Sequence, residues 1–139
     1  MVYVDTSALV ALLTAEPETA RMRAWFEANT LPLVSADWCA VEFTSALAAK
    51  RRAKQLRPAH VTRAHAAFDS LTAGGLRLLP LSRATFVRAA ELCGAPDSAL
   101  RAGDALHLAS ALEAGAQTLA GLDATMNEAA QRLGLAVLP

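Results

Sequence analysis

Four acidic residues lie in surroundings that otherwise favour a hydrophobic core. Asp5 follows a three-residue apolar run, Glu42 lies between valine and phenylalanine, Asp104 opens an alanine- and leucine-rich segment, and Asp123 follows a leucine. Carboxylates are costly to desolvate, and they repel one another when they converge. A divalent cation is the simplest compensation for such a group. The four acids therefore predict metal-assisted chemistry.

The segments that must position these acids alternate between strand and helix. Strands are expected at residues 2–4, 31–34, 76–81, 117–121 and 135–138. Helices are expected at 8–15 (capped by Thr6 or Ser7), 18–28, from Ser35 or Asp37 to 53, from Pro58 to Gly74-Gly75, from Ser82 to Gly94, at 103–114 and at 125–133. Short strands separated by helices predict an α/β fold with a five-stranded parallel sheet and helices on both faces. The chain is short enough for one domain, residues 1–139.

This arrangement predicts where the acids meet. Open parallel sheets bind ligands outside the carboxyl ends of their strands. Asp5 and Asp123 directly follow predicted strands, and Asp104 stands in the first turn of a helix, at the same edge. Glu42 lies about one turn into its helix, and its longer side chain can reach back. Four separate connections are therefore expected to deliver one acid each to one edge of the sheet.

Each acid also has a purely structural explanation. Asp5 or Asp123 could cap the helix that follows it, and Asp104 could interact favourably with the positive end of a helix dipole. Glu42 could be a solvated helix residue. Among the other acids, only Asp97 is a further candidate, as an outer contributor to the site.

Neighbouring polar residues support the site in different ways. Ser7 is expected to contact metal-bound water or to cap the backbone, with Thr6 beside it. His107 lies three residues after Asp104, on roughly the same helix face. The favoured role for His107 is a hydrogen-bonded histidine beside the core, although contact with the site is possible.

The charge balance conceals a basic surface. The chain carries 13 acids and 13 Lys plus Arg, so setting the four candidate acids aside leaves nine acids and a net charge of +4. A basic surface suits a polyanionic substrate. The densest basic stretch, residues 50–54 with Arg57 beyond it, could be a solvated helix end or a nucleic-acid contact.

Other features bear on location. No apolar run reaches the roughly 18 residues that span a bilayer, and Asp5 interrupts the apolar N-terminus, so neither a membrane span nor a secretory signal is expected. Cys39 and Cys93 are expected to be small, reduced core residues, as in a cytoplasmic protein.

Three motifs, in their order and spacing, resemble those of PIN-domain ribonucleases, and in particular the VapC-type toxins of toxin–antitoxin pairs. They are VDTSAL at residues 4–9, VEFTSAL at 41–47 and DALHLA at 104–109. The resemblance covers essentially the whole chain. It implies a flavodoxin-like parallel sheet, RNA cleavage that depends on Mg²⁺ or Mn²⁺, a small cognate antitoxin as partner, and a homodimer.

The resemblance also implies roles for individual residues. Asp5, Glu42 and Asp104 match the acidic triad, Asp123 matches the fourth acid, and Ser7 matches the small hydroxyl residue that supports the first acid. The triad would hold one Mg²⁺, and Asp123 would complete a second position. The chain departs from the family at Gly121, where relatives often carry threonine or serine.

Two alternatives remain. A haloacid-type phosphohydrolase also begins with a strand and an aspartate, but its chemistry needs a second aspartate where this chain has Ser7. A non-catalytic PIN-like module that binds RNA or protein would not need all four acids.

Overall fold

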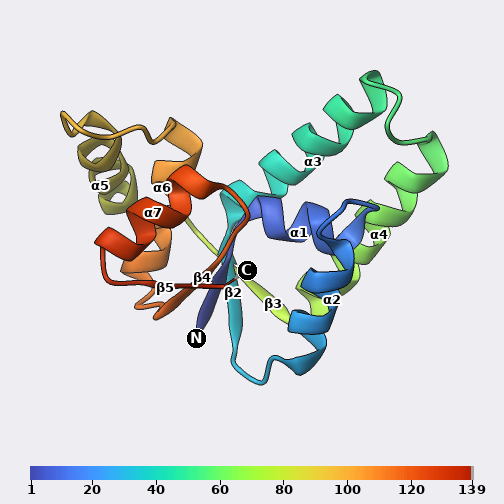
Figure 1. Ribbon diagram of the computed structural model, residues 1–139, viewed down its shortest axis with the longest axis horizontal. Helices are drawn as coiled ribbons and strands as arrows, with labels where there is room; N and C mark the ends of the chain where they lie inside the picture. Colours follow the sequence, from blue (N-terminus) through green and yellow to red (C-terminus); the bar gives the residue numbers. More distant parts are fainter. Residues whose placement is uncertain (139) are drawn as a thin grey trace.

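The computed structural model describes residues 1–138 as a parallel sheet covered by helices on both faces (Figure 1). The elements in chain order are β1 (Val2–Val4), α1 (Thr6–Leu13), α2 (Thr19–Ala28), β2 (Leu33–Ala36), α3 (Asp37–Arg52), α4 (Pro58–Gly74), β3 (Leu76–Leu79), α5 (Arg83–Gly94), α6 (Ala102–Glu113), β4 (Thr118–Ala120), α7 (Ala124–Arg132) and β5 (Ala136–Leu138). The predicted α/β class with five parallel strands is confirmed.

The strand order places β1 at the centre of the sheet. The order is β3-β2-β1-β4-β5, and every neighbouring pair is parallel. The chain first moves outward from β1 to β2 and β3, and then returns to place β4 on the other side of β1. The direction of winding therefore reverses between β1 and β4, where a sheet of this type opens a crevice for ligands.

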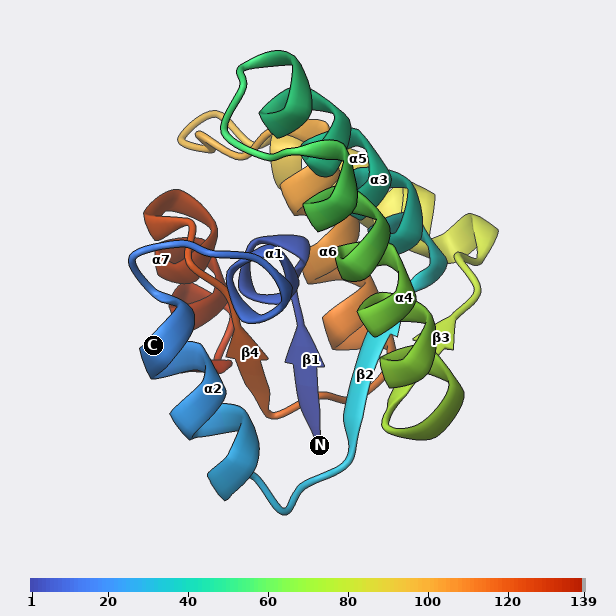
Figure 2. The same ribbon diagram turned by 90° about the vertical axis from the view of Figure 1, so that its right-hand side faces the viewer.

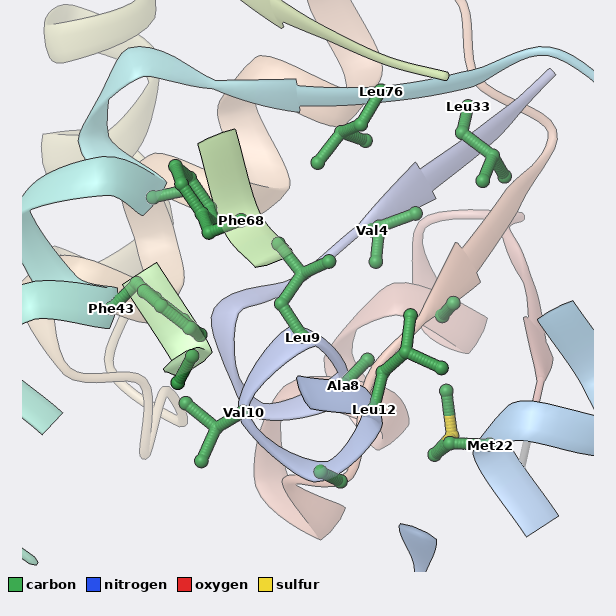
Figure 3. Packing of buried hydrophobic residues seen from close by; sticks show 14 of the residues in the cluster. Val4, Ala8, Leu9, Val10, Leu12, Met22, Leu33, Phe43, Phe68 and Leu76 are labelled. Atoms are coloured by element: carbon green, nitrogen blue, oxygen red, sulfur yellow. The ribbon is translucent and has the colours of Figure 1, made fainter. Parts of the chain in front are cut away.

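The alternation of side chains along β1 divides the core in two. Val2 and Val4 face a cluster formed with helices α1 to α4, whereas Tyr3 faces the other side, towards α6 and α7. Figure 3 shows the first cluster, in which Leu9 of α1 and Phe43 of α3 pack below the sheet. Both clusters are apolar, so β1 is buried on both faces, as expected for the central strand of a parallel sheet.

Several predicted boundaries were wrong, each for a local reason. Asp5, and not Thr6 or Ser7, is the N-cap of α1. The second strand is Leu33–Ala36 rather than 31–34. All four residues of the strand are buried, whereas residues 31 and 32 are exposed. The third strand stops at Leu79 instead of 81, since Pro80 follows and has no N–H for the sheet.

The start of α3 also differs from the prediction. Ala36 occupies the N-cap position and no side chain caps the helix there, so neither Ser35 nor Asp37 has the predicted role. Ser82 does cap α5, as predicted, by accepting a hydrogen bond from the backbone N–H of Thr85.

Two further findings concern location. Within residues 1–138, no helix is long and apolar enough to cross a membrane. Cys39 is buried and Cys93 is partly exposed, and both are free thiols. Burial raises the pKa of Cys39 to about 11, so its thiol stays protonated at neutral pH.

Candidate active site

Asp5 stands at the carboxyl end of β1, where the winding of the sheet reverses. Its extended backbone lets its Oδ2 accept a hydrogen bond from the backbone N–H of Ser7, 3.0 Å away, and a second from the Ser7 hydroxyl. The same hydroxyl accepts a hydrogen bond of 2.9 Å from the backbone N–H of Leu122, in the connection after β4. Ser7 therefore ties the first acid to the neighbouring connection, and Asp5 is only 5% exposed.

Glu42 reaches this position from the second turn of α3. Its Oε2 accepts a hydrogen bond of 2.7 Å from the Thr6 hydroxyl and lies 2.6 Å from Nε2 of His107. The ligand atoms of Asp5, Glu42 and His107 all lie within 4.8 Å of one another. Three elements far apart in the sequence therefore bring their polar side chains to one point.

His107 is the most deeply buried member of this group, with none of its surface exposed. Its Nδ1 lies 2.8 Å from the Tyr3 hydroxyl, and its Nε2 faces the Thr6 hydroxyl at 3.1 Å and the Asp5 carboxylate at 3.4 Å. Because Nε2 faces the Glu42 carboxylate, which only accepts hydrogen bonds, Nε2 carries a proton. We call Tyr3, Asp5, Thr6, Glu42 and His107 the inner group.

The inner group contains an ion pair between the Glu42 carboxylate and the His107 imidazole. Burial alone would raise the pKa of Glu42, but hydrogen bonds from His107 and Thr6, with the charge of His107, outweigh burial and lower it. Burial alone would lower the pKa of His107, but the hydrogen bond to Glu42 and the negative charges of Asp5, Glu42 and Asp104 outweigh burial and raise it. The ion pair of Glu42 with His107 therefore compensates for the loss of water around both groups.

Asp104 and Asp123 lie at the rim of the same edge, and we call them the outer pair. Asp104 accepts a hydrogen bond of 3.3 Å from the backbone N–H of Arg101, and Asp123 accepts one of 2.8 Å from Met126. Burial, followed by the negative charges of Asp123, Asp5 and Glu42, raises the pKa of Asp104 above its usual value. The charges of the other three acids therefore act on Asp104. Asp123 also has the helix-capping contact foreseen as its alternative, and Asp104 lies in the first turn of α6, where the helix dipole favours an acid.

Gly103 allows α6 to approach Glu42. A Cβ at this position would lie 2.5 Å from Glu42 Oε1 and 3.4 Å from Trp38 Nε1. Sequence reasoning missed both Gly103 and Trp38. One indication was available for Gly103, because a glycine inside a helix costs about 1 kcal/mol relative to alanine and is often explained by a close approach.

The space beside Gly121 is filled differently from the family pattern. A Cβ on Gly121 would meet Met126 Cε at 3.1 Å, Asn127 Oδ1 at 3.3 Å and Asp5 Cβ at 3.4 Å. The Asn127 side chain donates a hydrogen bond of 3.0 Å to the Gly121 carbonyl oxygen. Asn127 and Met126 thus occupy the room that a larger side chain would need.

The structure groups the remaining candidates unevenly. Thr6 and Ser7 both contact acids of the site, and His107, expected mainly beside the core, contacts Glu42 directly. Asp97 instead lines a surface hollow with Arg132. The oxygen-rich set of Asp5, Glu42, Asp104 and Asp123 has the donor chemistry that small hard divalent cations prefer.

A family model of the PIN domain matches residues 2–131, so the chain belongs to the PIN-domain family. A curated relative, "Ribonuclease VapC47" of Mycobacterium tuberculosis (strain CDC 1551 / Oshkosh), is 34% identical over 113 residues, which cover 81% of this chain and 76% of the relative. This relationship places the chain among the VapC-type members of the family.

Solved structures share the fold. A crystal structure of Mycobacterium tuberculosis VapC20, described as a sarcin-ricin loop cleaving toxin, matches with a TM-score of 0.77 at 18% identity, over 93% of this chain and 95% of that one. The structure of FitAcB from Neisseria gonorrhoeae matches with a TM-score of 0.74 at 20% identity, over 100% and 97% of the two chains. At these identities the likeness concerns the fold alone.

Proposed function

We propose that this chain is a metal-dependent endoribonuclease that hydrolyses RNA phosphodiesters and acts as the toxin of a type II toxin–antitoxin pair. The observation that carries the proposal is the cluster of Asp5 and Glu42 with His107 at the edge where the winding reverses, and the effect of both acids on the pKa of Asp104 supports it. The 34% identity to a VapC-type ribonuclease supports the same activity.

Within this proposal, Asp5, Glu42, Asp104 and Asp123 hold Mg²⁺ or Mn²⁺. A bound ion would acidify an attacking water and stabilise the charge that develops on the phosphate. Ser7 and Thr6 keep the carboxylates of Asp5 and Glu42 in fixed orientations through their hydrogen bonds. A fixed orientation matters because groups that stabilise a transition state act best when they need no rearrangement during the reaction.

The proposed partners follow from the same relationship. A small antitoxin and a homodimer are proposed for this chain because its motifs resemble those of VapC-type toxins, and structures of FitAB and of VapBC2 from Rickettsia felis, each bound to a DNA fragment, share the fold. An enzyme acting on cellular RNA would work in the cytoplasm.

The decisive experiment is cleavage of total RNA with Mg²⁺, with Mn²⁺ and with EDTA. The wild-type protein should cleave only with metal, and Asp5→Asn and Asp104→Asn should both be inactive. Cleavage that survives both substitutions would refute the proposed site. RNA binding without cleavage under every metal condition would favour the non-catalytic module instead.

A second measurement tests the role of charge. Four acids repel RNA until a cation neutralises them, so RNA affinity should rise on addition of Mg²⁺ at matched ionic strength. Equal affinities with and without Mg²⁺ would contradict this role.

A further inference from the structure

The positive charge of the molecule is concentrated in one helical hairpin. Residues 43–68 contain six of the 13 Lys and Arg residues and none of the 13 acids. We call this segment the basic arm; it comprises α3 beyond Glu42, the connection at 53–57, and α4 as far as Phe68. Outside the basic arm and the four site acids, seven Lys and Arg face nine acids. The excess of +4 therefore resides in the basic arm and is not spread over the surface.

Most of these cations are exposed and have no ion-pair partner among residues 1–138. Arg51, Arg52, Lys54 and Arg57 are all exposed. Of the six, Lys50 forms the only ion pair within the described residues, with Glu16. The remaining charges are therefore available to a partner.

Helix dipoles explain only part of this charge. Arg51 and Arg52 in the last turn of α3 interact favourably with the negative end of that helix. Arg57, however, is the N-cap residue of α4, where the dipole disfavours a cation. Lys54 has a φ of 58°, a left-handed conformation that costs a non-glycine residue roughly 1–2 kcal/mol, so backbone conformation does not explain a lysine there either. The charge at the tip of the basic arm therefore calls for a different explanation.

Helix α3 connects the basic arm to the site. Glu42, Ser45, Ala49 and Arg52 follow one another at spacings of three, four and three residues, so they share one side of the helix. Between the acid and the cation, this side carries only the small exposed residues Ser45 and Ala49. Ten residues of helix span about 15 Å, so an RNA strand that passes over Glu42 along α3 would reach Arg52 within a few nucleotides. Figures 1 and 2 show α3 and α4 running side by side, with α3 extending away from the sheet.

We propose that the basic arm binds the phosphate backbone of the RNA that flanks the scissile bond. This inference rests on the proposed function, because the flanking strand is defined by the cleavage site. The phenylalanines of the basic arm, Phe43 and Phe68, are buried in the core and cannot stack on bases. The exposed cations would therefore make the contact, and a contact between cations and phosphates is electrostatic and independent of sequence. An acidic protein is the rival occupant, and it is an outcome of the test below.

The test compares two pairs of charge-neutralising substitutions. The arm pair is Arg51→Gln with Arg52→Gln. The control pair is Arg77→Gln with Arg132→Gln, two exposed residues at the start of β3 and the end of α7, on the edge of the sheet opposite the site. Binding of a fluorescent single-stranded RNA of 20 nucleotides is measured by anisotropy between 50 and 200 mM KCl. Ca²⁺ replaces Mg²⁺, and gels confirm that the RNA stays intact.

Each cation that contacts a phosphate of single-stranded RNA contributes about 0.7 to the salt slope. The arm pair should therefore reduce the slope by about 1.4, which makes the loss of affinity across this salt range about sevenfold smaller. The control pair should keep the wild-type slope. An unchanged slope in the arm pair, or an equal reduction in both pairs, overturns the proposal. If the arm pair keeps the RNA slope but loses binding to polyglutamate, the occupant is an acidic protein and the proposal is again wrong.

These outcomes are separate from those of the proposed function. RNA binding is measured without turnover, so a protein that binds RNA through the basic arm but never cleaves it would refute the nuclease and retain the binding surface. Cleavage of RNA by a protein whose arm pair keeps the wild-type salt slope would support the nuclease and refute the binding surface. Thermal melting of both pairs should match that of the wild type, because all four positions are exposed.

Discussion

The inner group and the outer pair place acids at the same edge of the sheet but hold them in different ways. In the inner group, Asp5 accepts a backbone hydrogen bond from Ser7, but the acids also bond to other side chains, and the His107 imidazole opposes the carboxylates of Asp5 and Glu42. In the outer pair, Asp104 and Asp123 rely on backbone N–H groups. The pKa of Glu42 is lowered and that of Asp104 is raised. The contacts of Glu42 therefore outweigh the cost of burying its charge, whereas those of Asp104 do not. The difference indicates that protein contacts hold the inner group in place, whereas no positive side chain among residues 1–138 fully offsets the charge of Asp104, as expected of a residue that would bind a cation.

The largest expected effect comes from removing an inner charge. Asp5→Asn or Glu42→Gln should reduce RNA cleavage by about 10²–10³-fold, as expected for loss of one preorganised group that stabilises the transition state. Initial rates on a labelled RNA provide the measurement, and Glu128→Gln on the exposed surface of α7 is the matched control. Near-normal rates in either inner variant would remove that residue from the site.

Gly103 tests whether the inner group must be rigid. The methyl group of Gly103→Ala would collide with Glu42 Oε1, which cannot move freely because Thr6 and His107 hold the other oxygen. A displacement of about 1 Å can cost about 100-fold in rate, with little loss of stability. Gly94→Ala is the control, because nothing lies within 4 Å of its added Cβ. Equal rates in the two variants would show that Glu42 tolerates displacement.

His107 tests whether the acids of the inner group depend on their buried support. Loss of a group that orients a metal ligand typically costs about 10–100-fold in metal affinity or activity. His107→Asn should therefore weaken Mn²⁺ binding in calorimetry by this factor. His107→Gln can place a donor near the Nε2 position, and it should recover part of the affinity.

Spectroscopy separates support from direct ligation by the same residue. Because Nε2 of His107 is engaged with Glu42, bound Mn²⁺ should show no coupling to a histidine nitrogen in electron spin-echo spectra. A clear nitrogen coupling that disappears in His107→Asn would make His107 a ligand and contradict the supporting role.

Removing the charge of Asp104 should stabilise the metal-free fold. Its raised pKa means that the folded, metal-free protein disfavours its charge, so Asp104→Asn should increase the melting temperature in EDTA at pH 7. The asparagine can still accept the hydrogen bond from Arg101. About 3 °C is expected for each kcal/mol gained in a domain of this size. Asp69→Asn, on the exposed surface of α4, is the control. A lower melting temperature would show that the protein stabilises the charge of Asp104 without metal.

The smallest expected effect is the pH dependence of the Glu42 and His107 pair. A lowered acid pKa stabilises the fold above the usual value of 4.5, and this stability is lost as pH falls through the folded pKa. A raised histidine pKa stabilises the fold below 6.5, and this stability is lost as pH rises through the folded pKa. The difference in unfolding free energy between wild type and Glu42→Gln should therefore be largest between about pH 4.5 and 6.5. Urea titrations in EDTA measure it, and a difference that does not vary with pH would contradict the ion pair.

Sequence reasoning went far on the placement of the acids and less far on their contacts. The run before Asp5 and the leucines before Asp123 predicted strands ending at one edge, and the observed topology brings both residues there. The caps were predicted less well, because serine, threonine and aspartate are nearly equivalent at an N-cap and only the observed backbone selects Asp5. The site roles of the four acids stay predictions until the substitutions are made.

The sequence by itself determined the class of the fold and the residues that carry charge. Alternating apolar segments and helix stops specify strands and helices locally, and the acid-free stretch at 43–68 is visible in the sequence alone. Only the tertiary structure decided that His107 of α6 meets Glu42 of α3 and Tyr3 of β1, and that Gly103 leaves room for them. These partners are 65 and 104 residues apart along the chain. Contacts of that kind depend on the order of the strands and the packing of helices across the sheet, which no local pattern of residues specifies.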